Sequence, residues 1–131
     1  MRKIAALVLT VLTFFVLSTE SSALPKGAVL IDSENGRVLF EYNKDEKLPM
    51  ASTTKIMTCL LALECGTLSD TVTFSEHACR MPRVHLGAPK GSSFTLESLL
   101  YSLMLESHND SAVAIAEHIG GSVEGFAAMM N

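Results

Sequence analysis

A change in chain character around Ser52 is the feature that most restricts how this chain can fold. The approach Leu48-Pro49-Met50-Ala51 contains a proline and favours extended backbone, whereas Ile56 to Leu63 is an apolar run typical of a helix. Between them stands Ser52-Thr53-Thr54-Lys55. Residues three apart lie on one face of a helix, with Cβ atoms about 5–6 Å apart. The pattern therefore predicts that the Ser52 hydroxyl and the Lys55 amine lie close together where the helix begins.

A serine beside a lysine can form an activated nucleophile. The lysine removes the hydroxyl proton only when its pKa falls from about 10.4 to about 7 to 8, and nearby apolar side chains can lower the pKa by excluding water. The alternative is a serine N-cap followed by a surface lysine. With 14 serines and 6 lysines in 131 residues, chance gives roughly 0.6 pairs at this spacing, so the pair needs support from its context.

The N-terminus has the composition of an export signal. Arg2 and Lys3 precede an apolar run from Ile4 to Leu17, and the small residues Ser21 and Ala23 suit cleavage after Ala23. The run is shorter than the roughly 20 residues that a membrane span needs, although an uncleaved anchor is the alternative. We expect residues 1–23 to be a signal peptide and residues 24–131 to be exported to the cell envelope.

Composition excludes several classes of function. The chain is 48% apolar and carries a net charge of −4 without a basic cluster, which argues for a globular core and against nucleic-acid binding. Cys59, Cys65 and Cys79 allow at most one disulfide, and the first two point to different faces of the predicted helix. His77 and His85 lie near Cys79 but lack a second close pair of ligands. We therefore expect buried thiols, loop histidines and no metal site.

The rest of the pattern predicts a hairpin followed by helices. Ala28 to Asp32 and Arg37 to Tyr42 flank a turn, which indicates a β-hairpin. Gly66 is expected to end the Ser52 helix as its C′ residue, and residues 75–93 are expected to form a short helix and loop. Three later helices are predicted: Leu96 to about Leu105 after the N-cap Thr95, Ala112 to Ile119 after a cap at Asn109 or Asp110, and Val123 to Met130 after Ser122. The first of these is apolar on most sides and should be buried.

A second polar cluster, Ser107-His108-Asn109, lies in the short break between two of these helices. Rigid flanking helices would hold a hydroxyl and an amide in place, which suits a site that relays a proton and binds a substrate amide. The alternative is ordinary helix-end chemistry, and the same Ser-x-Asn pattern at Ser33-Glu34-Asn35 falls in the hairpin turn, where it is structural.

Together these residues resemble the serine D-alanyl-D-alanine carboxypeptidases, the low-molecular-mass penicillin-binding proteins. The S-x-x-K motif followed by an S-x-N-type triplet belongs to the set shared by penicillin-binding proteins and class A β-lactamases. The likeness runs from about Ala28 to Asn131. It implies an α/β (α+β) fold of the β-lactamase/transpeptidase-like type, with an antiparallel sheet, helices and an all-α lobe, which this chain would contain only in part.

The resemblance also implies roles for four residues. Ser52 would attack the penultimate D-alanine of a peptidoglycan pentapeptide, with Lys55 taking its proton. Ser107 would relay a proton to the leaving D-alanine, and Asn109 would hold Lys55 and the substrate backbone. No metal or organic cofactor is expected, β-lactams would be covalent inhibitors, and the complete protein could associate peripherally with a membrane.

Two departures from the family pattern limit this interpretation. His108 stands where the family more often has a small residue, and a solvent-facing spacer is its expected role. No Lys-Thr-Gly follows the triplet, so we expect 24–131 to be the N-terminal part of the catalytic domain and to be inactive by itself. The alternatives are an endopeptidase or β-lactamase on the same scaffold, or a non-catalytic secreted module that binds the cell wall.

Overall fold

The computed structural model describes residues 25–131, so the predicted signal peptide lies outside the described residues. The chain divides into two compact units between Leu48 and Pro49. None of the helices in residues 25–131 combines the length and the apolar composition needed to cross a membrane.

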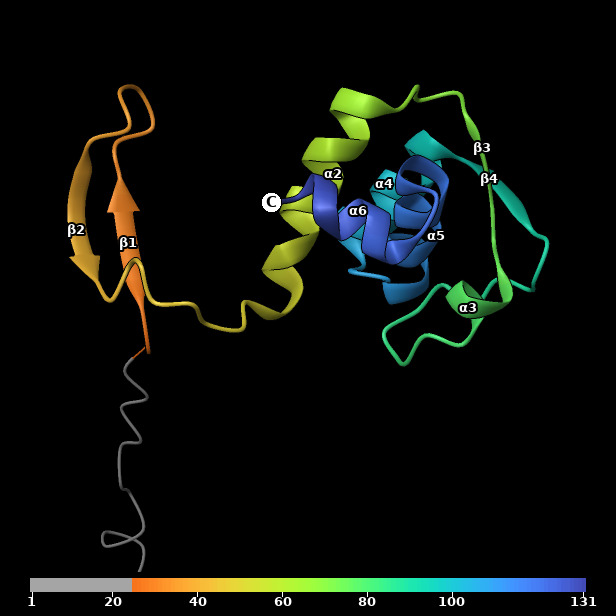
Figure 1. Ribbon diagram of the computed structural model, residues 1–131, viewed down its shortest axis with the longest axis horizontal. Helices are drawn as coiled ribbons and strands as arrows, with labels where there is room; N and C mark the ends of the chain where they lie inside the picture. The colour runs from red at the N-terminus through yellow and green to blue at the C-terminus, as the bar shows by residue number, and fades with distance from the viewer. Residues whose placement is uncertain (1–24) are drawn as a thin grey trace, which may run out of the picture. The chain divides into compact units, whose positions relative to one another are not determined.

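The first unit contains the predicted β-hairpin, which the structure confirms. Strand β1 (Ala28–Ile31) pairs antiparallel with β2 (Val38–Tyr42), and Ala28 lies opposite Tyr42 (Figure 1). The turn between the strands is closed by a hydrogen bond from the Gly36 amide to the Asp32 carbonyl, 2.8 Å. Gly36 has φ +72°, a conformation in which a side chain would be strained.

The second unit begins with the Ser52 segment. Residues Ala51–Thr53 form one turn of 3₁₀ helix (η1), and the α-helix α2 (Thr54–Cys65) follows directly. Ser52 therefore lies in the tighter turn before α2. The helix ends before Gly66, but the prediction of a C′ glycine was wrong, because Gly66 has an extended backbone. A Cβ at this position would stand 2.6 Å from Leu96 Cδ2, so a larger residue would require the Leu96 side chain to shift.

The second unit also contains a small sheet that was not predicted from the sequence. Strand β3 (Thr71–Thr73) pairs antiparallel with β4 (Ser93–Thr95), and the short helix α3 (Glu76–Cys79) lies in the connection between them. Both strands have only three residues, and β4 runs straight into the next helix, so its sequence gives a helix-start signal and no strand signal.

Three helices complete this unit: α4 (Leu96–Leu105), α5 (Asn109–Gly120) and α6 (Val123–Met129). The predicted N-cap Thr95 is confirmed, because its hydroxyl accepts the Ser98 amide at 3.2 Å. The predicted cap of α5 was wrong: the N-cap residue is His108, and the side chains of Asn109 and Asp110 bond to other segments.

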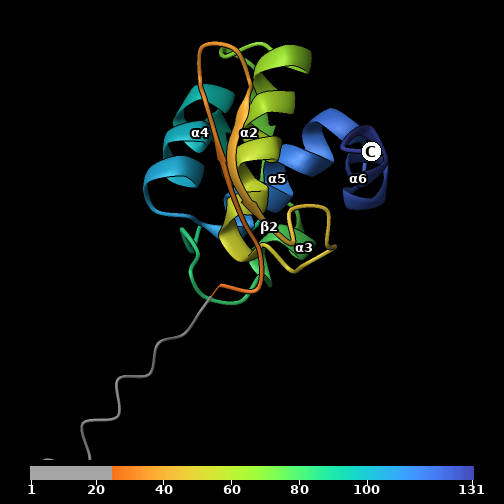
Figure 2. The same cartoon turned by 90° about the vertical axis from the view of Figure 1, so that its left-hand side faces the viewer.

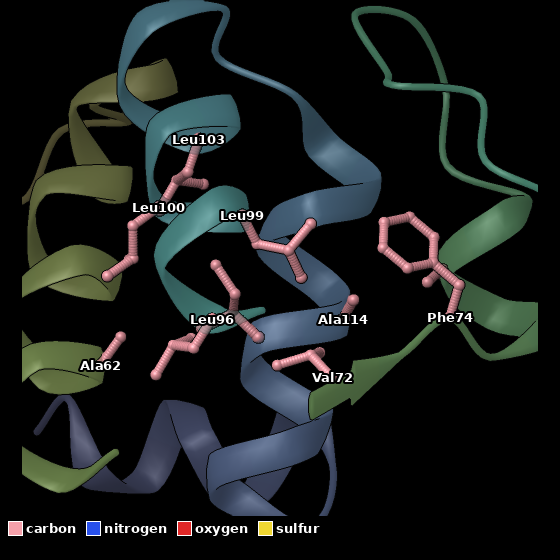
Figure 3. Close-up of a cluster of buried hydrophobic side chains, with 10 residues drawn as sticks. Ala62, Val72, Phe74, Leu96, Leu99, Leu100, Leu103 and Ala114 are labelled. Carbon is pink, nitrogen blue, oxygen red and sulfur yellow. The ribbon is translucent and has the colours of Figure 1, made fainter. Parts of the chain in front are cut away.

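The core lies where α2, α4 and α5 meet the small sheet, and Figure 3 shows its side chains converging from these elements. In Figure 2, α2 and α4 lie side by side, and the two helices are in contact. Ala62 comes from α2, Ala114 from α5 and Val72 from β3, while α4 supplies the largest share: Leu96, Leu99, Leu100 and Leu103. This core holds α2 against the turn between α4 and α5.

Two predictions about burial were wrong in part. The α4 residues Tyr101, Met104 and Leu105 are exposed, because only one face of the helix packs on α2 and α5. Of the thiols, Cys65 and Cys79 are exposed and Cys59 is half-buried, and all three are free.

Candidate active site

Lys55 joins the two polar clusters that the sequence singled out. Its Nζ lies 2.6 Å from the carbonyl oxygen of Ser107, 3.0 Å from Ser107 Oγ and 2.8 Å from Asn109 Oδ1. Helix α2 supplies the lysine, and the turn between α4 and α5 supplies its three oxygen partners. Residues more than fifty positions apart in the sequence thus form one hydrogen-bonded group.

Two effects act on the charge of Lys55. Partial burial removes water from the amine and lowers its pKa from 10.5. The three oxygen acceptors around Nζ oppose this, because they suit the three protons of an ammonium group. Burial is the larger effect, so the pKa of Lys55 lies below its ordinary value.

Ser52 lines a pocket that also reaches Lys55. The pocket has a volume of about 250 Å³, and Ser52, Lys55 and Ser107 share it with an apolar set of neighbours that includes Ile56, Leu103 and Met104. Ser52 itself is exposed. The predicted nucleophile, base and relay residue therefore open onto one space, where a substrate could reach all three.

The backbone on both sides of this site is strained. Ala51, directly before Ser52, has φ +47°, and Ser107 has φ +60°. A residue with a Cβ pays about 1–2 kcal/mol for this left-handed conformation. Such residues persist where surrounding contacts hold them, and they concentrate at functional sites. At Ser107 the conformation allows the carbonyl and the hydroxyl of one residue to reach the same amine.

Asn109 and its neighbour Asp110 fasten the turn to the loop that precedes β4. Asn109 donates its backbone amide to the Val84 carbonyl, 2.8 Å, and Nδ2 to the Pro82 carbonyl, 3.0 Å. The buried carboxylate of Asp110 accepts the amides of Leu86 and Gly87 at 2.8 and 2.9 Å. The sequence predicted Asp110 only as a possible helix cap, because an acid in the first turn of a helix is common and does not reveal a distant partner.

His108 is not the solvent-facing spacer that the sequence suggested. The residue is half-buried, and its Nδ1 lies 2.7 Å from Ser102 Oγ on α4. Ser102 Oγ in turn lies 2.8 Å from Ser111 Oγ on α5. The prediction failed because a side chain in a turn can fold back onto the helices that the turn connects, and the sequence does not show this.

No group of three or more His, Cys, Asp or Glu residues within residues 25–131 is placed to hold a metal ion. Two of the histidines instead lie beside single carboxylates. His77 Nδ1 lies 3.0 Å from Glu117 Oε1, and His118 Nε2 lies 3.6 Å from Asp70 Oδ2.

The model of the D-alanyl-D-alanine carboxypeptidase family matches residues 17–131. The chain belongs to this family. Among curated carboxypeptidases, DacF of Bacillus subtilis is 43% identical over 111 residues, and DacC of Escherichia coli is 34% identical over 114 residues. The alignments cover 81% and 79% of this chain and 28% of each relative. The chain thus spans little more than a quarter of the length of these relatives.

Solved structures give the same result for the fold. A D-alanyl-D-alanine carboxypeptidase from Mycobacterium tuberculosis matches with a TM-score of 0.75 and 28% identity, over 85% of this chain and 44% of that one. Penicillin-binding protein 5 from Haemophilus influenzae matches with a TM-score of 0.72 and 32% identity, over 81% of this chain and 33% of that one. The predicted family and fold class, a partial α/β fold of the penicillin-binding type, are therefore confirmed.

Proposed function

We propose that the complete carboxypeptidase-family protein containing this chain is a serine-type D-alanyl-D-alanine carboxypeptidase, which trims peptidoglycan stem peptides through an acyl-enzyme on Ser52. The observation that carries the proposal is the bonding of Lys55 Nζ to both Ser107 and Asn109 beside the pocket that Ser52 lines. Family membership supports the substrate class.

The first step is attack by Ser52. Neutral Lys55 takes the hydroxyl proton as Ser52 Oγ bonds to the carbonyl carbon of the penultimate D-alanine. Burial of the amine favours this neutral form. Backbone amides, that of Ser52 among them, would stabilise the oxyanion, as amides at the start of a helix do.

The second step is departure of the terminal D-alanine. Ser107 Oγ lies 3.0 Å from Lys55 Nζ, which is within the distance for passing the proton on to the leaving amine. Asn109 holds Lys55 through Oδ1 and would hold the substrate backbone. Water then cleaves the Ser52 ester, releasing the shortened peptide and restoring the serine hydroxyl. β-Lactams would acylate Ser52 in the same way.

The location and activity of the protein follow from the same proposal. The substrate lies outside the cytoplasmic membrane, which agrees with an export signal in residues 1–23, and the complete protein could associate peripherally with that membrane. We expect residues 24–131 alone to be inactive, since the apolar side chains of β1, β2 and one face of α2 are exposed to water. The later strand with Lys-Thr-Gly would be needed to complete the site.

The test is covalent labelling of the complete gene product with a fluorescent penicillin, followed by mass spectrometry of the labelled peptide. We expect label on Ser52, none in Ser52→Ala, and labelling slowed by about 10²–10⁴-fold in Lys55→Met. Ser69→Ala, at a serine of the turn between α2 and β3, is the matched control and should label normally. Label on another residue would overturn the mechanism.

The rate of labelling should also depend on pH. The fraction of neutral Lys55 grows as the pH rises, and because its pKa is lowered by burial, the rate should reach half its maximum below pH 10.5. The unfolded chain binds more protons between the two pKa values, so the free energy of unfolding should rise with pH across that interval. A rate that is flat with pH would remove Lys55 as the base.

A second candidate is an endopeptidase on the same scaffold. A D-alanyl-D-alanine endopeptidase from Pseudomonas aeruginosa is 30% identical over 112 residues of alignment. Release of free D-alanine from a pentapeptide supports the carboxypeptidase, whereas cleavage confined to cross-linked dimers supports the endopeptidase. A wall-binding module without turnover, or a β-lactamase, would release no D-alanine, and the latter would hydrolyse penicillin rapidly.

A further inference from the structure

The strained turn at Ser107 needs contacts that hold its backbone in place. The left-handed backbone of Ser107 directs both its carbonyl and its hydroxyl toward Lys55. On the other side of the turn, the backbone amide of Asn109 donates to the Val84 carbonyl at 2.8 Å. Between these two residues, the backbone amide of His108 reaches the Ser102 carbonyl only at 3.5 Å, which is a weak contact. The His108 carbonyl accepts the Ala112 amide at 3.3 Å, which is also a long contact, so the backbone alone holds the middle of the turn loosely.

The side chain of His108 supplies the stronger attachment. Its Nδ1 lies 2.7 Å from Ser102 Oγ, and Ser102 Oγ lies 2.8 Å from Ser111 Oγ. Ser102 belongs to α4, and Ser111 is fully buried in α5. The three side chains thus link the turn to both helices that it connects. We call this chain of hydrogen bonds, His108–Ser102–Ser111, the turn clasp.

We propose that His108 is a positioning residue for acylation: through the turn clasp it holds Ser107 and Asn109 at the distances at which they contact Lys55. The role rests on the proposed acyl-enzyme function. His108 contacts neither substrate nor Ser52 in this proposal, and no bond to it forms or breaks during the reaction.

The chemistry of the clasp requires a polar atom at the position of Nδ1. The Ser102 hydroxyl has one proton to donate and can also accept, so it can bond to Nδ1 and to Ser111 at the same time. An asparagine at position 108 would place an amide oxygen or nitrogen near the same point. An alanine would leave Ser102 and Ser111 bonded to each other, and the middle of the turn would lose its side-chain bond to α4.

The experiment measures the rate of Ser52 acylation by a fluorescent penicillin in the complete gene product. His108→Ala and Ser102→Ala should each slow acylation about five- to tenfold, the range expected for one lost hydrogen bond. The double variant should be no slower than either single variant, because both break the same link. His108→Asn should restore most of the rate. His77→Ala removes a hydrogen-bonded imidazole from α3 and is the matched control, with an unchanged rate.

A merely structural role for His108 predicts different results. His108→Asn would then be as slow as His108→Ala, or the effects of His108→Ala and Ser102→Ala would multiply, and either outcome overturns the proposal. An acylation rate in His108→Ala within twofold of that of the unchanged protein would also overturn the proposal. Ser102→Ala removes a single oxygen, so it tests the clasp even if His108→Ala fails to fold.

A second measurement separates this proposal from the proposed function. The pKa of Lys55, followed by NMR of ¹³Cε-labelled lysine, should rise toward 10.5 in His108→Ala. A loosened turn admits water to the amine, and this outweighs the weakened bonds to Ser107 and Asn109 because burial is the larger effect on this pKa. If penicillin fails to label the unchanged protein but this rise occurs, the acyl-enzyme function is wrong and the clasp still holds Ser107 and Asn109 against Lys55. If labelling occurs and the pKa stays the same in His108→Ala, the clasp is wrong.

Discussion

The hairpin and the helical unit contain similar apolar residues but expose them very differently. In β1, Val29, Leu30 and Ile31 are each more than half exposed, whereas Leu96 and Leu99 of α4 are fully buried. A two-stranded ribbon has two faces and can cover neither with its own side chains, while three helices and a small sheet enclose a common centre. The number of packed layers, and not apolar composition, decides which residues form a core.

Substitutions in the helical core should have the largest effect on the free energy of unfolding. Leu99→Ala should lower the free energy of unfolding by about 2–5 kcal/mol, because it removes buried methyl groups and leaves a cavity. Leu30→Ala in the hairpin is the matched control, since its side chain is 56% exposed, and it should change the value by less than about 0.5 kcal/mol. Urea denaturation measures both. Equal effects would mean that the hairpin is covered in solution.

Replacing a glycine should likewise destabilise the helical unit more than the hairpin. A Cβ at Gly120 would stand 2.4 Å from the backbone nitrogen of Phe126, so Gly120→Ala should cost about 1–3 kcal/mol by forcing α5 and α6 apart. Gly36 in the hairpin has open space around it and is constrained only by its φ of +72°. Gly36→Asn should therefore be tolerated, because asparagine adopts this conformation readily. Thermal unfolding of both variants tests the difference, and a tolerated Gly120→Ala would contradict the packing of α5 on α6.

Capping residues offer a finer test. Thr95→Ala should lower the free energy of unfolding by about 1 kcal/mol, because the Ser98 amide loses its acceptor at the start of a core helix. Asp32 performs a similar task in the hairpin turn, where its carboxylate accepts the Glu34 amide at 3.0 Å. Asp32→Ala should speed amide hydrogen exchange in β1 and β2 and leave exchange in α4 unchanged. Faster exchange in α4 would show that the two units unfold together.

The smallest expected effect concerns a surface ion pair. Glu76 on α3 contacts Arg80 and, at 3.1 Å, Lys90. All three side chains are exposed, so Glu76→Gln should change the free energy of unfolding by less than about 1 kcal/mol. Added salt should change the free energy of unfolding of the unchanged protein by a similarly small amount. A larger loss would mean that these charges organise the loop leading to β4.

Several parts of the fold could be predicted because their signals are local. The hairpin turn at Gly36, the N-cap at Thr95 and the end of α5 at Gly121 each depend on the conformation of a few neighbouring residues. The strand β4 could not be predicted, because three residues carry no periodicity. The capping of α5 was misjudged because Asp110 bonds to Leu86 and Gly87, more than twenty residues away in sequence.

The candidate site also has a part that the sequence predicts and a part that depends on tertiary packing. The sequence by itself determined which polar side chains the candidate site contains: a serine, a lysine three residues later, and a Ser-x-Asn triplet after a second helix. Only the tertiary structure decided that Lys55 bonds to Ser107 and Asn109, and that His108 turns back onto Ser102. The physical reason is that helix-start and turn signals act over a few residues, whereas distances between α2 and the α4–α5 turn depend on how a shared core packs.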